Sequence, residues 1–209
     1  MKKNVITLGV LVCMLASCQC KQDNTVTCCD QENPVVSTIM SRRSIRKYKP
    51  QPVERNKMDL ILQCGINAPN GQNKQSWEVR VVDNPALLNE MKEAIAKGHP
   101  NMPAEMAKGC FRGAPTMVFI ARDTKYDFSP YDCGLLAENM VLSAWSMGIG
   151  SVCLGSPVRF LTDNAECAPC VEKLGFSEGY ELSLCIGFGY PDETPEAKPR
   201  DWGKVKYVD

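Results

Sequence analysis

Four short segments with the apolar patterns of β-strands, interleaved with helical patterns, constrain the fold of this chain more than any other feature. Residues 77–81 alternate apolar and polar side chains, as a half-buried strand does. Residues 116–121, 151–154 and 181–188 are short, mostly apolar runs, which suit buried strands. This order of elements predicts an α+β fold with a central mixed or antiparallel four-stranded sheet.

Helical patterns fill much of the remaining chain. Asn33 followed by Pro34 is typical of an N-cap and a first-turn proline, which predicts a short helix ending near residue 40. Residues 53–66 and 88–98 place apolar side chains at helical spacing. Their expected core positions are Met58, Ile61, Leu62, Ile66, Leu88, Met91 and Ile95. Residues 131–147 are apolar on nearly every side and predict a covered central helix, whereas residues 99–115 are expected to be irregular.

The first residues have the organisation of an export signal. Lys2 and Lys3 precede an apolar run that stops near Leu15, whereas a membrane-spanning helix needs about 20 apolar residues. Residues 15–18, Leu-Ala-Ser-Cys, resemble the bacterial lipobox, in which the peptidase cuts before a cysteine that then carries lipid. We therefore predict a lipoprotein signal peptide at 1–17, lipidation of Cys18, a flexible polar tether at 18–33 and one folded domain at 34–209.

These segments also predict where the protein works. It would be exported and held at the bacterial cell envelope by its lipid alone, on the periplasmic or the outer face. A plain secreted protein, cleaved nearby, is the alternative.

The composition excludes several classes of function. Lysine plus arginine and aspartate plus glutamate both number 24, so the chain has no net charge to attract nucleic acid, and no such partner is expected. A single histidine, His99, argues against His-rich metal sites and against most hydrolase triads.

Export would change how the 12 cysteines are interpreted, because disulfides persist outside the cytoplasm. Four of them fall within apolar patterns and are expected to be inert packing residues: Cys64, Cys133, Cys153 and Cys185. Cys167 and Cys170 have CxxC spacing, which fits a redox pair, a local disulfide, free thiols or half of a metal site. No second ligand pair accompanies them, so no metal site is predicted.

Two basic runs are candidates for binding a phosphate. Arg42, Arg43, Ser44 and Arg46 lie within five residues at the end of the first predicted helix, and guanidinium groups match phosphate oxygens bidentately. Lys198 and Arg200 supply two more cations near the end of the chain. A solvated basic surface and a polar tail are the alternative interpretations of these runs.

The order of these pieces resembles the FMN-dependent nitroreductase family over residues 34–209. Residues 42–48, Arg-Arg-Ser-Ile-Arg-Lys-Tyr, are similar to the opening motif of that family. Residues 68–77 have the length and the Ala-Pro, Asn, Gln and Trp placements of its second motif. Lys198 and Arg200 stand where the family supplies its last phosphate ligands, and Gly-Tyr-Pro at 189–191 is similar to the close of its last core strand.

The resemblance implies helices on both faces of the sheet and a homodimer with an exchanged C-terminal tail. Each dimer would hold two FMN molecules at its interface, each in contact with both chains. The implied FMN ligands from one subunit are Arg42, Arg43, Ser44, Arg46, Lys198 and Arg200, with Gly155 beside the flavin ring. Those from the other subunit are Pro69, Asn70, Gly71 and Asn73.

The resemblance also implies the chemistry. No protein side chain is catalytic, because flavin N5 carries the electrons from NAD(P)H to a small oxidised acceptor of nitroaromatic or quinone type, with ping-pong kinetics. The choice between NADH, NADPH and another reductant stays open. The alternatives are a flavin enzyme with another chemistry, such as reductive dehalogenation, and a non-enzymatic lipoprotein that binds metal or a partner through its cysteines.

Overall fold

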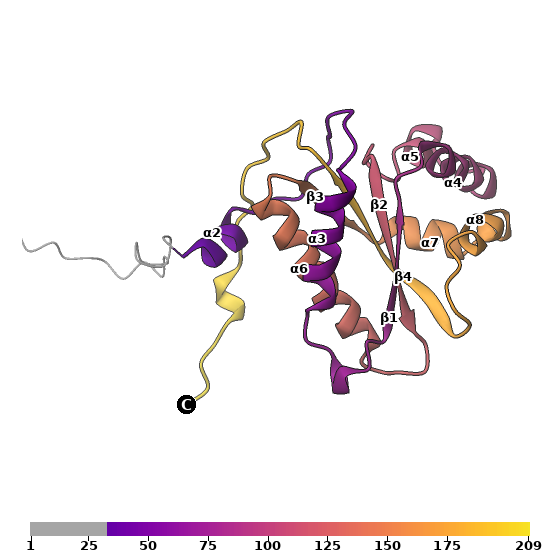
Figure 1. The fold of residues 1–209 in the computed structure, drawn as a ribbon. Coiled ribbons are helices and arrows are strands. Elements are labelled where there is room, and N and C mark those ends of the chain that lie inside the picture. The colour runs from indigo at the N-terminus through magenta and orange to yellow at the C-terminus, as the bar shows by residue number, and fades with distance from the viewer. Residues whose placement is uncertain (1–32) are drawn as a thin grey trace, which may run out of the picture.

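A computed structural model describes residues 33–209 and shows a single four-stranded antiparallel sheet in the order β1–β2–β4–β3 (Figure 1). The strands are β1 (Trp77–Val82), β2 (Thr116–Asp123), β3 (Gly150–Leu154) and β4 (Tyr180–Gly189). All three ladders between them are antiparallel, and a parallel bridge joins Ser44 to Ser151 beside β3. The predicted α+β class and its four strands are confirmed.

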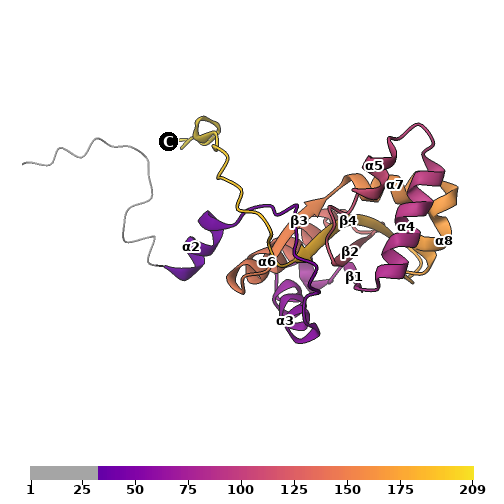
Figure 2. The same cartoon turned by 90° about the horizontal axis from the view of Figure 1, so that it is seen from above.

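Helices cover both faces of this sheet (Figures 1 and 2). One face carries α3 (Arg55–Ile66) and α6 (Ser129–Ser146), and the other carries α4 (Pro85–Gly98), α5 (Ala104–Lys108), α7 (Ser156–Thr162) and α8 (Ala168–Glu172). Three single turns, η1 (Gly71–Asn73), η2 (Ala165–Cys167) and η3 (Trp202–Lys204), complete the description together with α2 (Pro34–Ser41). The two helical layers confirm the arrangement that the resemblance implies.

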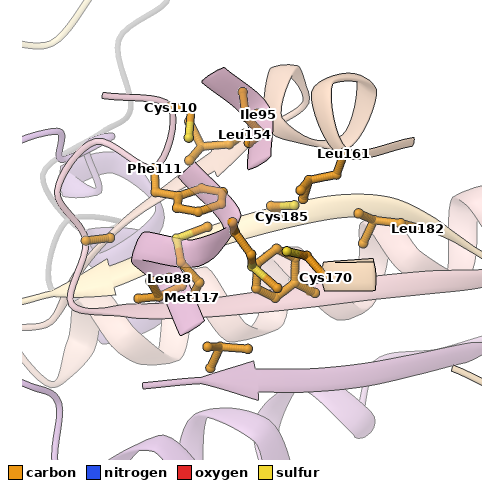
Figure 3. Close-up of a cluster of buried hydrophobic side chains, with 14 of the residues drawn as sticks. Leu88, Ile95, Cys110, Phe111, Met117, Leu154, Leu161, Cys170, Leu182 and Cys185 are labelled. Carbon is orange, nitrogen blue, oxygen red and sulfur yellow. The ribbon is translucent and has the colours of Figure 1, made fainter. Parts of the chain in front are cut away.

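The sheet separates two apolar cores because successive side chains of a strand point to opposite faces. Met117 and Phe119 enter the core under α4, α5 and α7, which Figure 3 shows, whereas Val118 and Ile120 enter the core under α3 and α6. All four side chains are fully buried. Burial of each contributes roughly 1.5–3 kcal/mol to the free energy of folding, so β2 stabilises both layers.

The two ends of the described chain leave this body on the same side (Figures 1 and 2). The Asn33 side chain caps α2 by accepting hydrogen bonds from the backbone N–H groups of Val35 and Val36. No residue of α2 is buried, and Val35 is 63% exposed. The C-terminal segment is similarly bare, with Tyr207 90% exposed. Both segments therefore present apolar side chains that residues 33–209 leave uncovered.

The structure corrects three expectations about the helices. Helix α6 is not covered on most sides, since Tyr131 is 68% and Leu135 is 46% exposed. Ile66, placed in the core by helical spacing, is 50% exposed because it ends α3. Residues 99–115 include the short helix α5, and two further helices, α7 and α8, were not predicted. Their few apolar residues fill the second core without a long periodic pattern.

Several predictions about the N-terminus lie outside the described residues. These are the signal peptide at 1–17, the lipidated Cys18 and, apart from Asn33, the tether at 18–33. Within residues 33–209, no helix combines the length and the hydropathy needed to cross a membrane.

The close packing around Gly187 on β4 generates a stability prediction. A Cβ atom at this position would lie 2.7 Å from Ala114 Cβ and 3.4 Å from the sulfur of Met117. Because the nearer atom belongs to a short, buried side chain, Gly187→Ala is expected to lower the free energy of unfolding by about 1–3 kcal/mol, measured by urea denaturation.

Gly134 on α6 provides the matched control for this substitution. A Cβ there would meet no heavy atom within 4 Å. Gly134→Ala is therefore expected to raise the free energy of unfolding by about 0.5–1 kcal/mol, since alanine is the better helix former. Stability that is unchanged or raised in Gly187→Ala would contradict the packing described here.

Candidate FMN site

The first candidate binding segment is fixed to the edge of the sheet. Ser44 forms a parallel bridge with Ser151 on β3, and the Ile45 N–H donates to the Ser151 carbonyl oxygen at 2.9 Å. The Ile45 side chain is 1% exposed and lies against Gly150, where a Cβ atom would approach Ile45 Cγ1 to 2.7 Å. Glycine at position 150 therefore lets this segment lie directly on β3.

The chain that follows β4 returns along the same segment. Tyr48 forms an antiparallel bridge with Pro191, and the Asp192 N–H donates to the Lys47 carbonyl oxygen at 2.9 Å. The Glu193 carboxylate accepts hydrogen bonds from the backbone N–H groups of Arg46 and Lys47. These contacts direct residues 195–200 toward residues 42–46, although the two runs are about 150 positions apart in the sequence.

The Tyr48 side chain stabilises the pairing of these two segments. Its hydroxyl donates to the carbonyl oxygen of Ile45 at 2.6 Å and also approaches that of Gly187. Burial, with a smaller contribution from the Glu193 carboxylate, raises the pKa of the Tyr48 phenol far above its usual range. The hydroxyl therefore stays protonated and remains a hydrogen-bond donor.

A small hollow of about 120 Å³ lies where the two runs meet. Its lining residues are Arg42, Arg43, Ser44, Arg46, Pro195, Glu196, Lys198 and Arg200. Five of these carry a positive charge and one carries a negative charge. Pockets that enclose a whole drug-sized ligand measure about 300–1,000 Å³, so this hollow matches a single anionic group, such as a phosphate, and not an entire cofactor.

The cations around the hollow have few anionic partners. Within residues 33–209, Arg42 alone among the five forms an ion pair, at 3.7 Å from Glu138 on α6. The Nε atom of Arg42 is buried and has no hydrogen-bond partner in the described part of the chain. The Arg46 and Arg200 guanidinium groups donate hydrogen bonds to backbone carbonyl oxygens, those of Ser44 at 3.3 Å and Lys198 at 3.2 Å. A buried N–H without a partner is costly, and an anion in the hollow would supply the missing acceptor.

The second candidate segment, residues 68–77, is held by α6. The buried Asp132 carboxylate accepts from the Gly71 N–H at 2.9 Å and from the Ser76 hydroxyl at 2.6 Å. The Asn70 side chain accepts from the Gln75 N–H at 2.8 Å. Asp132 therefore fixes the loop to α6, and the Asn70 side chain bonds to the backbone of the same loop.

Comparison with known proteins assigns this fold to a family. The model of the Nitroreductase family matches residues 39–190. The NADPH-flavin oxidoreductase of Vibrio harveyi is 30% identical over 175 residues, which cover 80% of this chain and 70% of that protein. The chain belongs to the nitroreductase family.

Solved nitroreductase structures support the same assignment. A nitroreductase with bound FMN from Desulfitobacterium hafniense is similar to this chain with a TM-score of 0.76 and 28% identity, covering 85% of this chain and 99% of that one. A nitroreductase with bound FMN from Bacteroides fragilis gives a TM-score of 0.76 and 27% identity, with 85% and 100% covered.

The nitroreductase chain brings together only part of the site that its sequence predicts. Six of the predicted FMN ligands line the hollow: Arg42, Arg43, Ser44, Arg46, Lys198 and Arg200. The predicted ligands Pro69, Asn70, Gly71, Asn73 and Gly155 do not. The loop with the first four follows the far end of α3, away from the segment that pairs with β3 (Figure 1). A single chain therefore presents the two motifs separately.

Gly155 lies at a different point along the same strand edge. It directly follows β3, is exposed, and a Cβ atom there would meet no heavy atom within 4 Å. From Ser151, beside the hollow, to Leu154 the strand advances three residues, or roughly 10 Å. The cation hollow and the open surface at Gly155 therefore lie along the same edge strand.

Sequence patterns did not reveal every residue around the hollow. Pro195 and Glu196 line it, Glu138 pairs with Arg42, and Glu193 fixes the backbone beside it. No local pattern marks these residues, because each reaches the site through the folded arrangement of the chain.

The cysteines depart from expectation at one position. Cys133 and Cys185 are buried as expected and Cys64 is half-buried, but Cys153 on β3 is exposed. The prediction that Cys153 is a packing residue is therefore wrong, because residues 33–209 leave its side chain exposed. Cys167 and Cys170 are buried free thiols, and residues 33–209 contain no cluster of three potential metal ligands.

Proposed function

We propose that this nitroreductase is an FMN-dependent oxidoreductase that takes electrons from NAD(P)H and passes them to a small acceptor of nitroaromatic or quinone type. The observation that carries the proposal is the hollow in which cations from both ends of the domain converge without enough anionic partners. A flavin phosphate matches that need in size and in charge. The names of its relatives, a flavin oxidoreductase and FMN-bound nitroreductases, point the same way.

The chain's own residues would bind and orient the cofactor. Arg42, Arg46 and Arg200 would hold the phosphate through charge-assisted hydrogen bonds, and the bridge from Ser44 to β3 would fix their direction. The backbone at Gly155 would lie against the ring, since no side chain obstructs that position. When bound, FMN supplies the two-electron chemistry, so the protein needs no nucleophile of its own.

The proposed reaction balances with NAD(P)H as the only reductant. One equivalent of NAD(P)H and one proton convert a nitro group into a nitroso group and water, with NAD(P)⁺ as the other product. Donor and acceptor would visit the same site in turn, which gives ping-pong kinetics. His99 is not available as a catalytic group near the hollow, because its Nε2 atom contacts the Phe160 carbonyl oxygen at 3.0 Å.

We further propose that the working unit is a homodimer with exchanged C-terminal tails. The second motif does not line the hollow of its own chain and follows the other end of α3 (Figure 1), so a partner would supply Pro69, Asn70, Gly71 and Asn73. The uncovered apolar side chains of α2 and of the tail, such as Val35 and Trp202, support this arrangement because contiguous exposed apolar surface is typical of interfaces.

The site of action is proposed from the sequence alone. The lipobox at residues 15–18 supports export and a diacylated Cys18 that anchors the domain to the cell envelope. An exported enzyme would meet little NAD(P)H, so the identity of the physiological reductant depends directly on this assignment.

The first test measures FMN affinity by fluorescence titration of the apoprotein. Arg200→Ala removes a guanidinium group from the hollow and is expected to cost about 1.5–3 kcal/mol, or roughly a 10- to 150-fold rise in the Kd for FMN. Lys206→Ala removes a cation from the same tail outside the hollow and should leave the Kd within about twofold. Equal affinity in Arg200→Ala and the wild type would contradict the phosphate assignment.

The second test measures molar mass by light scattering. The FMN-loaded protein is expected to have the mass of two chains, and Asp substitutions at Trp202 and Tyr207 should favour the monomer because both side chains are exposed apolar groups of the tail. A monomer that binds FMN with full affinity would overturn the shared site.

The third test examines lipidation in a bacterial host fed with an alkyne-bearing fatty acid. The wild type should incorporate the label, and Cys18→Ser should lose it, because the lipobox places the acceptor thiol at that position. Cys20→Ser is the matched control and should keep the label. Incorporation that persists in Cys18→Ser would refute the anchor.

A further inference from the structure

A second cavity lies near the candidate FMN site and has a different character. It measures about 520 Å³ and is enclosed by α5, the end of β3 and the start of α7. Apolar groups dominate its wall, including Met106, Leu154, Pro157 and Phe160. The volume lies within the range of pockets that hold a small organic molecule. Its volume and its lining therefore suit a small, mainly apolar molecule.

The cavity adjoins the place that would hold the flavin ring. Leu154 and Ser156 line it, and Gly155 stands between them with open space above its backbone. The other end of β3 carries Ser151, which is bridged to Ser44 of the cation hollow. A molecule in this cavity would therefore lie beside Leu154 and Gly155, and Leu154 stands roughly 10 Å along the strand from Ser151.

Two charged side chains stand among the apolar groups of this cavity, and they differ in their partners. Glu105 forms an ion pair with Lys108 at 3.5 Å on α5, and both side chains are exposed. Arg112 is exposed, and its guanidinium makes no hydrogen bond or ion pair within the described part of the chain. Of the two charged side chains on this wall, Arg112 is therefore the one without a partner among the described residues.

The backbone fixes where this charge is presented. Arg112 has a φ of 56° and Gly113 a φ of 71°, so both occupy the left-handed region at the turn that leads into β2. A non-glycine residue in this region is uncommon and is held there by its surroundings. The Arg112 N–H donates to the Gly109 carbonyl oxygen at 2.9 Å, which closes the turn against the end of α5.

We propose that Arg112 determines acceptor specificity by favouring flat, apolar acceptors that carry an anionic group, such as an aromatic carboxylate. The apolar wall would take the ring of the acceptor, and the Arg112 guanidinium would pair with the carboxylate at the rim. The inference rests on the proposed function, because it names the class of acceptor that the same site reduces.

The experiment compares two acceptors of nearly the same shape, the anionic 4-nitrobenzoate and the neutral 4-nitrobenzamide, at saturating reduced nicotinamide. Arg112→Asn removes the charge and keeps a residue that tolerates a positive φ. It is expected to raise the KM for 4-nitrobenzoate about fivefold, as loss of a partly exposed ion pair does. The KM for 4-nitrobenzamide should change by less than about twofold.

Further variants separate the effect of the Arg112 charge from the effect of its side-chain shape. Arg112→Lys keeps the charge and should retain most of the preference, whereas Glu105→Gln should lower the KM for 4-nitrobenzoate by removing the opposing carboxylate. Arg159→Gln is the matched control, since Arg159 is an exposed cation on α7 that does not line the cavity. It should leave both KM values unchanged.

A binding measurement makes the proposal independent of turnover. Calorimetry with benzoate, which has no reducible nitro group, should give a Kd about fivefold higher for Arg112→Asn than for the wild type. Equal Kd values, or equal effects of Arg112→Asn on the two nitro compounds, would overturn the assignment. A raised KM for NADH with unchanged acceptor values would overturn it as well, since Arg112 would then serve the donor.

The measurements distinguish an error about the role of Arg112 from an error about the enzymatic function. A wild-type protein that binds FMN and reduces 4-nitrobenzamide supports the function whatever Arg112 does. A protein that takes up no FMN refutes the function, and benzoate calorimetry on that same protein still reports whether Arg112 binds a carboxylate.

Discussion

The rest of the candidate site depends on one set of backbone contacts, the pairing of residues 44–49 with β3 on one side and with the chain after β4 on the other. Each hydrogen bond contributes only about 1 kcal/mol to folding, and burial of Ile45 adds roughly 1.5–3 kcal/mol. Together they fix both ends of the domain against the same edge strand. Without this pairing the two basic runs would be separate surface features. Each run considered alone in the sequence suggests no more than that.

The charge distribution follows from the same arrangement. The chain has no net charge, and many of its surface charges are paired, as in Arg55 with Asp83 and Lys97 with Glu166. The hollow is the exception, since five cations gather there with few carboxylates nearby. Like charges repel at such distances, so the folded state carries an electrostatic cost that an anionic ligand would relieve. The cost is local, which explains why composition alone gave no sign of it.

Sequence patterns predicted the long helices and the strands of this fold better than the burial of their side chains. The four strands and helices α2, α3, α4 and α6 follow from periodicity and capping, which are local properties. Exposure of Tyr131 and Leu135 on α6 was not predicted, because a helix that is apolar all round looks the same whether the chain itself or another molecule covers it. Helices α7 and α8 are too short to give a periodic signal.

The candidate site shows the same division between local and distant information. The run Arg42–Arg46 is recognisable by itself, but its meeting with Lys198 and Arg200 follows from strand pairing across about 150 residues. Spacing cannot show that meeting, and only the family resemblance suggested it. Glu138, Pro195 and Glu196 had no signal of any kind, since their place near the hollow is set by the packing of α6 and the path of the tail.

The two motifs lie apart within one chain, and this separation bears on how the protein assembles. Helix α3 has 12 residues and so is roughly 18 Å long. The second motif follows the C-terminal end of α3, whereas the segment that lines the hollow pairs with β3 (Figure 1). Asp132 fixes the second motif through Gly71 and Ser76, so the loop is not free to swing toward the hollow. If both motifs contact one flavin, the second must therefore come from another copy of the chain. The exposed apolar faces of α2, α6 and the tail are then the surfaces that such a copy would cover.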